Sequence, residues 1–303
     1  MTETAAGSQD PLSLHGIVPP TVTAFEDDES VNYDATTAHA RFVVDHGCHG
    51  VVPLGTNGEF PLLTGEERRG VVEAVADEIS EVPVIAGVGA PSTHETLEFA
   101  AHAEEVGVDG IMVVTPYYYP LDSDAAVEHY RSVVEHVDLP VYVYYIPSKT
   151  GNELSLSTFD RIAALDGIAG VKDSSKDVPW LGQAIDAHPE LTFMAGSDSL
   201  LFPGLEVGCA GAVSAVANVF PELVVDLYEA YSEGNEARAR ELQSQVFKVR
   251  NAMKGGPYMS GVKTALSIRD VGFDVGGLRA PLRTMSDDQR ATLERDLRDL
   301  GMI

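Results

Sequence analysis

The 303-residue sequence predicts an α/β fold, a (β/α)8 TIM barrel with a C-terminal helical extension. Two observations support this fold class. Short apolar runs rich in Val and Ile recur about every thirty residues, and segments with helical apolar period lie between them. A doubly wound sheet is the alternative. It would need a glycine-rich phosphate loop between a strand and a helix, and the sequence contains neither GxGxxG nor a P-loop.

Eight strands are expected from the apolar runs. Their nearly continuous apolar character is typical of parallel strands that are covered on both faces. The expected strands lie at 16–25, 49–55, 82–89, 110–118, 140–146, 167–172, 191–197 and 208–216.

Helices are expected between the strands and after the last one. A possible capping box, formed by Ser92 and Glu95, opens one of them. The amphipathic segments are 33–47, 92–107, 123–137, 221–234, 236–253, 260–272 and 286–301. The last three exceed what a barrel needs, and no low-complexity linker precedes them. We therefore expect a catalytic barrel over 13–234 and a helical extension of the same domain over 235–303.

The charge balance is strongly acidic, with 47 acidic and 20 basic residues and a net charge of −27. The acidic residues are spread along the chain, which indicates a globular protein with an acidic surface. Such surfaces suit a cytoplasm with molar salt, where repulsion is screened, so a halophilic source is expected; an ordinary acidic protein is the alternative. Nucleic-acid binding and docking on anionic membranes are disfavoured, because both need clustered Lys and Arg.

A cytoplasmic location is expected from the cysteines and the first residues. Cys48 and Cys209 are too few for a disulfide framework, and the first ten residues have no basic or apolar signal region. The longest apolar run, 210–220, is far shorter than the roughly 20 residues that a membrane span needs.

Lys172 ends the sixth expected strand and is one of only six lysines. The active sites of such barrels lie at the carboxyl ends of the strands. Burial there disfavours a charged ammonium group, and a neutral amine attacks carbonyl groups to form a Schiff base. The alternative is a lysine that reaches solvent and pairs with Asp173.

Other strand ends also carry polar groups. Tyr144 ends the fifth strand and could relay protons near an imine, although an aromatic core residue is the alternative. Thr56 and Asn57 stand between two glycines after the second strand, which suggests a small carboxylate cradle. After the seventh strand, a polar segment could hold the hydroxyl groups of a polyol; it comprises Gly196, Ser197, Asp198 and Ser199.

Four segments in order resemble one enzyme superfamily. The motifs GTxGE, TPYY, YYIPxxTG and GxKDSS are similar to those of the dihydrodipicolinate synthase / N-acetylneuraminate lyase superfamily, which are pyruvate-dependent class I aldolases. The resemblance extends from about Gly16 to Leu282. It implies that Lys172 forms the imine and that Tyr144 shuttles protons.

The resemblance implies further roles. Tyr118 matches a catalytic tyrosine that reaches into a neighbouring subunit, which implies a homotetramer built as a dimer of dimers. No metal or organic cofactor is implied, because the imine itself is the electron sink. The expected substrate-binding residues are Thr56, Asn57, Gly58, Lys149, Gly196, Asp198, Ser199 and Val213.

Two departures from the superfamily pattern bear on the substrate. Asn57 stands where a second threonine is common, and Lys149 stands where dihydrodipicolinate synthases usually have arginine. The closest similarity is therefore to the 2-keto-3-deoxygluconate aldolase branch. We expect cleavage of such a 2-oxo acid to pyruvate and glyceraldehyde or its phosphate. The alternatives are a dihydrodipicolinate synthase, an imine-type deoxy sugar acid dehydratase and, in another class, an inactive barrel kept as a scaffold or metabolite-binding subunit.

The remaining histidines and cysteines are expected to be structural. The segment HGCHG, residues 46–50, looks like a metal site but lies at a helix-to-strand junction opposite the active end. Cys209 is expected to be a buried thiol. The histidines expected in loops or at the surface are His15, His94, His129 and His188.

Overall fold

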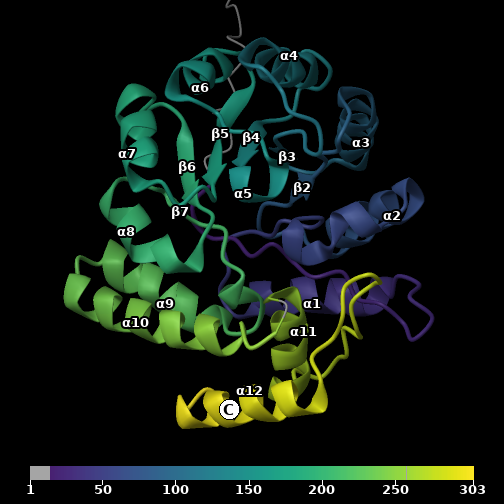
Figure 1. The fold of residues 1–303 in the computed structure, drawn as a ribbon, viewed down its shortest axis with the longest axis vertical. Coiled ribbons are helices and arrows are strands. Elements are labelled where there is room, and N and C mark those ends of the chain that lie inside the picture. The colour runs from purple at the N-terminus through teal and green to yellow at the C-terminus, as the bar shows by residue number, and fades with distance from the viewer. Residues whose placement is uncertain (1–13, 257) are drawn as a thin grey trace, which may run out of the picture.

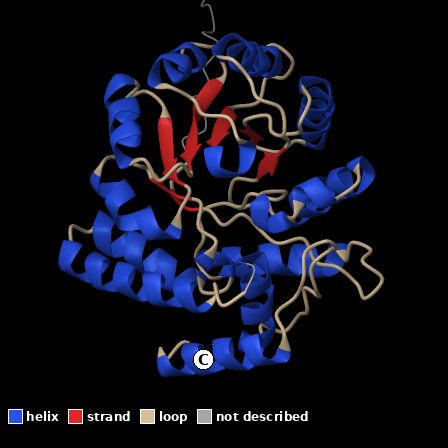
Figure 2. Cartoon of the chain, viewed as in Figure 1, coloured by secondary structure: helices blue, strands red, loops and turns tan. Residues whose placement is uncertain are grey.

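Parallel strands form a curled sheet inside a ring of helices (Figures 1 and 2). The computed structural model describes residues 14–256 and 258–303. The strand order is β1-β7-β6-β5-β4-β3-β2. The strands are β1 (Gly16–Ile17), β2 (Ile85–Gly87), β3 (Gly110–Val114), β4 (Val141–Tyr145), β5 (Ile168–Asp173), β6 (Thr192–Ala195) and β7 (Gly211–Ala212).

The segment 49–53 closes the sheet into a barrel between β1 and β2. The Val52 amide donates to the Pro19 carbonyl at 3.0 Å on one side, and the Val51 amide donates to the Pro83 carbonyl at 2.9 Å on the other. A parallel bridge also joins Val51 to Val84. The expected strand at 49–55 thus takes its place in the barrel without becoming a regular strand, and the (β/α)8 prediction is confirmed.

Helices surround the barrel, and the last helices lie together on one side of it (Figure 1). Those around the barrel are α1 (Tyr33–Asp45), α2 (Gly65–Glu78), α3 (Thr93–Val106), α4 (Ser123–Val134), α6 (Leu156–Ala163), α7 (Val178–Ala187), α8 (Leu201–Glu206) and α9 (Pro221–Ser232). The short α5 (Pro147–Thr150) follows β4 directly and lies inside this ring in Figure 1. The C-terminal helices are α10 (Glu236–Ala252), α11 (Tyr258–Arg269) and α12 (Asp287–Asp299). Short 3-10 turns are η1 (Thr56–Gly58), η2 (Phe60–Leu62), η3 (Asp198–Leu200) and η4 (Val216–Asn218).

Helix starts are fixed by polar side chains. Ser92 accepts a hydrogen bond from the Glu95 amide at 3.2 Å, which is one half of the predicted capping box. Complete boxes form at Thr64, before α2, and at Ser286, before α12. Each satisfies backbone N–H groups that have no partner within the helix.

The strands that carry the site are buried on both faces. Every residue of β3 and β4 is buried, in agreement with the apolar runs from which they were predicted. In the pairing of β4 with β5, Tyr144 lies beside Lys172. Within the described residues, no helix is long and apolar enough to cross a membrane.

Candidate active site

Lys172 lies inside the barrel near the carboxyl end of β5. Its side chain is buried, with 3% of the residue exposed. The Nζ atom lies 3.8 Å from the centroid of the Tyr144 ring. Among the described residues Lys172 forms no ion pair, so the alternative of a solvent-facing pair with Asp173 does not describe this structure. The amine is therefore held inside the barrel against a tyrosine ring.

Tyr144 links Lys172 to the turn that follows the segment 49–53 of the barrel. Its hydroxyl lies 3.1 Å from Oγ1 of Thr56, and only 5% of Tyr144 is exposed. Alternation along β4 turns the next side chain, Tyr145, away from Lys172 and onto the Trp180 ring, at 4.8 Å between centroids. Lys172, Tyr144 and Thr56 thus form a continuous group.

The segment 55–59 is built by close backbone approaches. A Cβ on Gly58 would lie 3.1 Å from the Thr21 carbonyl oxygen, and one on Gly55 would lie 2.9 Å from Pro20. The left-handed residues are the flanking Leu54 and Glu59, with φ of 59° and 53°. The glycines therefore serve close packing here, while non-glycine neighbours make the turn.

Asn57 brings an unpaired donor to this turn. The residue is 5% exposed, and its Nδ2 has no hydrogen-bond partner within the described part of the chain. Buried polar atoms of proteins are nearly always paired. A buried amide without a partner, on the residue that follows Thr56 in the turn, is suited to receive an anionic oxygen of a ligand.

Asp198, expected to hold substrate hydroxyl groups, has its carboxylate engaged by the protein. Oδ1 accepts from Ser214 Oγ at 2.5 Å and from the Val216 amide at 3.2 Å, and Oδ2 accepts from the Tyr258 hydroxyl at 2.9 Å. Nε of Arg250 lies 3.8 Å from the same Oδ2. The acid therefore joins the end of β6 to the segment after β7 and to helices α10 and α11.

Three other residues expected to bind substrate lie near β6 and β7, namely Gly196, Val213 and Ser199. Gly196 permits close strand packing, because a Cβ there would lie 2.1 Å from Ser174 Oγ. Val213 is buried and donates its amide to the Ala195 carbonyl at 2.9 Å. Ser199 is half-buried in η3.

Tyr118 lies outside this group in the single chain. It is 84% exposed with φ of 82°, and its ring packs edge-on against exposed Tyr119 at 5.0 Å between centroids. Asn152 holds the segment by donating to the carbonyl groups of Pro116 and Tyr119 at 2.8 and 2.9 Å. The left-handed backbone and two exposed rings place an aromatic projection beside the barrel mouth.

Lys149 is exposed on α5 and lines a cavity of about 230 Å³ that also reaches Thr56. Most of the wall is apolar. The remaining lining residues are Glu59, Phe60, Pro61, Leu62, Val114, Tyr117, Ile146, Thr150, Met259 and Leu282. The cavity places a single lysine charge over an apolar pocket that begins at Thr56.

The sequence interpretation missed a buried ion pair behind this cavity. Oε1 of Glu59 lies 2.8 Å from Nζ of Lys263 in α11. Glu59 belongs to the GTNGE segment, but nothing in the sequence indicates which cation faces it. The structure shows that Lys263 lies at a buried position of α11, which is unusual for a lysine.

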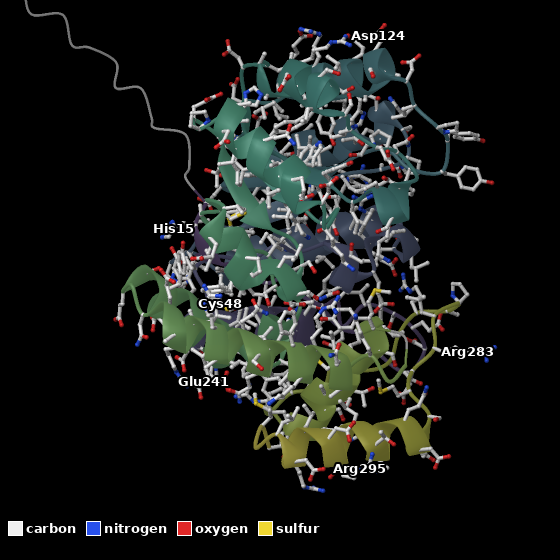
Figure 3. The ribbon with its side chains drawn as sticks, turned by 60° about the vertical axis from the view of Figure 1, so that its left-hand side comes forward. His15, Cys48, Asp124, Glu241, Arg283 and Arg295 are labelled. Carbon is white, nitrogen blue, oxygen red and sulfur yellow. The ribbon has the colours of Figure 1, made fainter. Side chains whose placement is uncertain are left out.

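The HGCHG segment lies away from this cavity. Figure 3 shows Cys48 and His15 on one side of the molecule and Arg283, next to the cavity-lining Leu282, on the opposite side. Cys48 and Cys209 are both buried free thiols, and for Cys209 this confirms the expectation. Among the described residues, no three His, Cys, Asp or Glu side chains are grouped to hold a metal ion.

The prediction for His129 was wrong. It lies on the inner face of α4, 3% exposed, with Nδ1 2.9 Å from Thr93 Oγ1, and burial lowers its pKa to about 4. A lone histidine in a helix gives little indication of which face it occupies. His94 is exposed as expected, and His188 is partly covered, with Nε2 2.9 Å from Asp160.

Comparison with known proteins finds one family over nearly all of the chain. A model described as the dihydrodipicolinate synthetase family matches residues 13–300. An uncharacterized DapA-like lyase of Halobacterium salinarum is 69% identical over 300 residues, which are 99% of this chain and 98% of the relative. A 4-hydroxy-tetrahydrodipicolinate synthase of Methanopyrus kandleri is 36% identical over 296 residues, covering 96% and 98%.

Solved structures share the fold. YagE, a prophage protein of the dihydrodipicolinic acid synthase family from E. coli K12, crystallised in complex with pyruvate, superposes with a TM-score of 0.91. Its sequence is 29% identical, and the match covers 95% of this chain and 99% of that one.

Proposed function

Because this chain belongs to the dihydrodipicolinate synthetase family of lyases, we propose that it is a Schiff-base aldolase that cleaves a 2-keto-3-deoxy sugar acid such as 2-keto-3-deoxygluconate. The products would be pyruvate and glyceraldehyde, or its phosphate. The observation that carries the proposal is the buried Lys172 amine beside the Tyr144 ring, with the Thr56 hydroxyl 3.1 Å from that tyrosine.

In the proposed reaction, Nζ of Lys172 adds to the C2 carbonyl, and Tyr144 gives a proton to the departing water. The resulting phenolate takes the proton of the C4 hydroxyl, and the electrons of that O–H bond form the aldehyde. The C3–C4 bond breaks, and its electron pair neutralises the protonated imine to give an enamine. Protonation at C3 and addition of water then release pyruvate and the free lysine.

Thr56 and Asn57 are proposed to hold the substrate carboxylate. The Thr56 hydroxyl and the unpaired Asn57 amide lie on the same short turn, next to the lysine–tyrosine pair. Fixing the carboxylate there would set C2 at a constant distance from Lys172 and so favour attack. The pyruvate complex of YagE is consistent with a site of this kind in a relative.

The sugar acid is preferred over aspartate semialdehyde because of two residues. Asn57 has no hydroxyl to pass a proton, and Lys149 is a point charge without the planar fork that grips a carboxylate. Dihydrodipicolinate synthase activity is the second candidate, supported by the Methanopyrus kandleri relative of that name.

We propose a cytoplasmic homotetramer in which Tyr118 completes a neighbouring subunit's site. The exposed ring, held on a left-handed backbone, is consistent with a residue whose partner lies on another chain. Sedimentation equilibrium measures the assembly, and Tyr118→Ala should lower activity without loss of the Lys172 adduct with pyruvate.

Borohydride reduction in the presence of pyruvate tests the chemistry. A mass increase on the peptide that contains Lys172 is expected, and inactivation without an adduct there would refute the imine mechanism. Separate assays then distinguish the substrates. The sugar acid should release pyruvate, whereas a synthase would consume pyruvate with aspartate semialdehyde, and a dehydratase would remove water without releasing pyruvate.

A further inference from the structure

A buried ion pair ties the turn that carries Thr56 and Asn57 to the C-terminal helices. Glu59 directly follows η1 and is 1% exposed; Lys263 of α11 is 4% exposed. Their Oε1 and Nζ atoms are 2.8 Å apart. The contact therefore joins the proposed carboxylate-binding turn to an element that is distant in the sequence.

Each member of the pair has a further partner. Oε2 of Glu59 accepts a hydrogen bond from the Arg279 amide at 3.0 Å, and Lys263 donates to the Gly277 carbonyl at 2.7 Å. The ammonium also lies 4.4 Å from the centroid of the Phe25 ring. Additional hydrogen bonds of this kind are what a buried ion pair needs to offset desolvation.

The turn depends on support from outside itself. Glu59 has φ of 53°, a left-handed conformation that residues other than glycine adopt rarely. Burial raises the pKa of Glu59 and lowers that of Lys263, so each charge depends on the other for its stability. The pair lies in the interior, where salt screens charges much less than at the surface.

We propose that Glu59 and Lys263 are positioning residues, whose ion pair holds residues 55–59 in the conformation in which Thr56 and Asn57 receive the substrate carboxylate. This inference rests on the proposed function. Among the described residues, no ion pair or hydrogen bond joins Glu59 or Lys263 to Lys172 or Tyr144, so both charges are assigned an action through the turn. Loss of the pair should therefore weaken capture of pyruvate more than it slows chemistry on substrate already bound.

Three variants separate positioning from stability. Lys263→Met leaves Glu59 buried without a cation, whereas the double variant Glu59→Gln/Lys263→Met removes both charges of the pair and should recover much of the lost stability. Glu222→Gln is the matched control, because it removes the partner of Arg269, which lies on the same helix but binds the start of α9.

The readouts are the pyruvate concentration for half-maximal borohydride trapping, the kcat of sugar-acid cleavage, and amide hydrogen exchange of Gly58 and Glu59 without ligand. These amides bond the Gly55 and Thr56 carbonyls and so report opening of the turn. Both Lys263→Met and the double variant should need at least about tenfold more pyruvate, exchange faster at these amides and keep kcat within a few-fold. Glu222→Gln should match the wild type.

A double variant that regains stability and also regains wild-type pyruvate saturation and exchange would show that the pair is only structural, which would overturn the proposal. If Lys263→Met does not fold, the double variant alone decides the matter. If wild-type protein forms no adduct with pyruvate, the proposed function fails, while hydrogen exchange still tests whether the pair holds the turn.

Discussion

Tyr144 contacts both site partners in the described structure: its ring lies 3.8 Å from the Lys172 amine, and its hydroxyl lies 3.1 Å from Thr56 Oγ1. Tyr144→Phe keeps the ring and its packing but removes the proton carrier. We expect kcat for cleavage to fall by about 10²- to 10⁴-fold, with little change in the free energy of unfolding. Steady-state assays and urea unfolding measure the two effects.

Tyr145→Phe is the matched control for this variant. It removes a hydroxyl from the adjacent, equally buried residue, which faces Trp180 and not Lys172. Activity close to that of the wild type is expected. Equal losses in the two variants would mean that the Tyr144 hydroxyl has no special part in the reaction.

Two buried histidines should make the folded state acid-sensitive. Burial lowers the pKa of His39 and of His129 from 6.5 to about 4. Between these pH values the unfolded chain binds more protons, so this stability is present above pH 6.5 and is lost as the pH falls towards 4. Each histidine should cost about 2 kcal/mol between pH 7 and pH 5.

Urea unfolding of His129→Asn at pH 7 and pH 5 measures this loss. The amide can still bond Thr93 but does not titrate, so the difference between the two pH values should shrink by about 2 kcal/mol. His94→Asn, at an exposed position, should leave it unchanged. An unaltered pH dependence in His129→Asn would contradict the assignment.

The position of a site residue could be predicted from the sequence where it follows from the residue's own strand. Lys172 and Tyr144 each end a recognisable apolar run, and the pairing of adjacent parallel strands brings them together. Asp198 and Lys263 depend instead on which distant side chains meet them, namely Tyr258 and Glu59. Local pattern carries no information on such partners, so the hydrogen bond between Tyr258 and Asp198 and the Glu59–Lys263 ion pair were not predicted.

At the scale of elements, the strands were predicted in the right places, but most of them were predicted too long. The first expected strand spans 16–25, whereas β1 ends at Ile17, because Pro19 and Pro20 have no N–H to donate. Pro53 and Pro83 limit regular pairing in the same way around the segment 49–53. The apolar runs thus predicted where the strands of the barrel lie. The prolines within these runs determine where regular strand pairing ends.

The junction of β5 and β6 tolerates no side chain at Gly170. A Cβ there would lie 2.1 Å from the Thr192 carbonyl oxygen on β6. Gly170→Ala should therefore force the strands apart and cost at least about 2–3 kcal/mol of unfolding free energy. Because Lys172 lies two residues further on β5, adduct formation with pyruvate should fall as well.

Gly182→Ala, on the helix that follows β5, should raise the unfolding free energy that Gly170→Ala lowers. Gly182 lies within α7, and a Cβ there would meet nothing within 4 Å. The substitution should raise the unfolding free energy by about 0.5–1 kcal/mol and leave adduct formation intact. Thermal or urea unfolding compares the two variants, and equal stability changes would contradict the packing described at Gly170.

At the scale of the whole molecule, the net charge of −27 sets how stability responds to salt. A cation in the last turn of a helix interacts favourably with the helix dipole, but several helices of this chain have no basic residue there. In α1, α3 and α9 a carboxylate occupies the last turn or the C-cap position instead. These are Asp45, Glu105 and Glu233, all exposed and outside the ion pairs of the described chain. Repulsion among such groups must be screened before the folded state gains its full stability.

The triple variant Asp45→Asn/Glu105→Gln/Glu233→Gln tests whether this repulsion causes the salt requirement. Raising KCl from about 0.1 M to above 1 M shortens the Debye length from about 10 Å to under about 3 Å, so wild-type protein should gain stability in urea unfolding. At low salt the variant should exceed the wild type by about 0.3–1 kcal/mol per site, and the difference should vanish at high salt. Pyruvate saturation should change little over the same range in both proteins, because the Glu59–Lys263 pair is buried. A stability difference that persists at high salt would show that the carboxylates act through local packing and not through their charge.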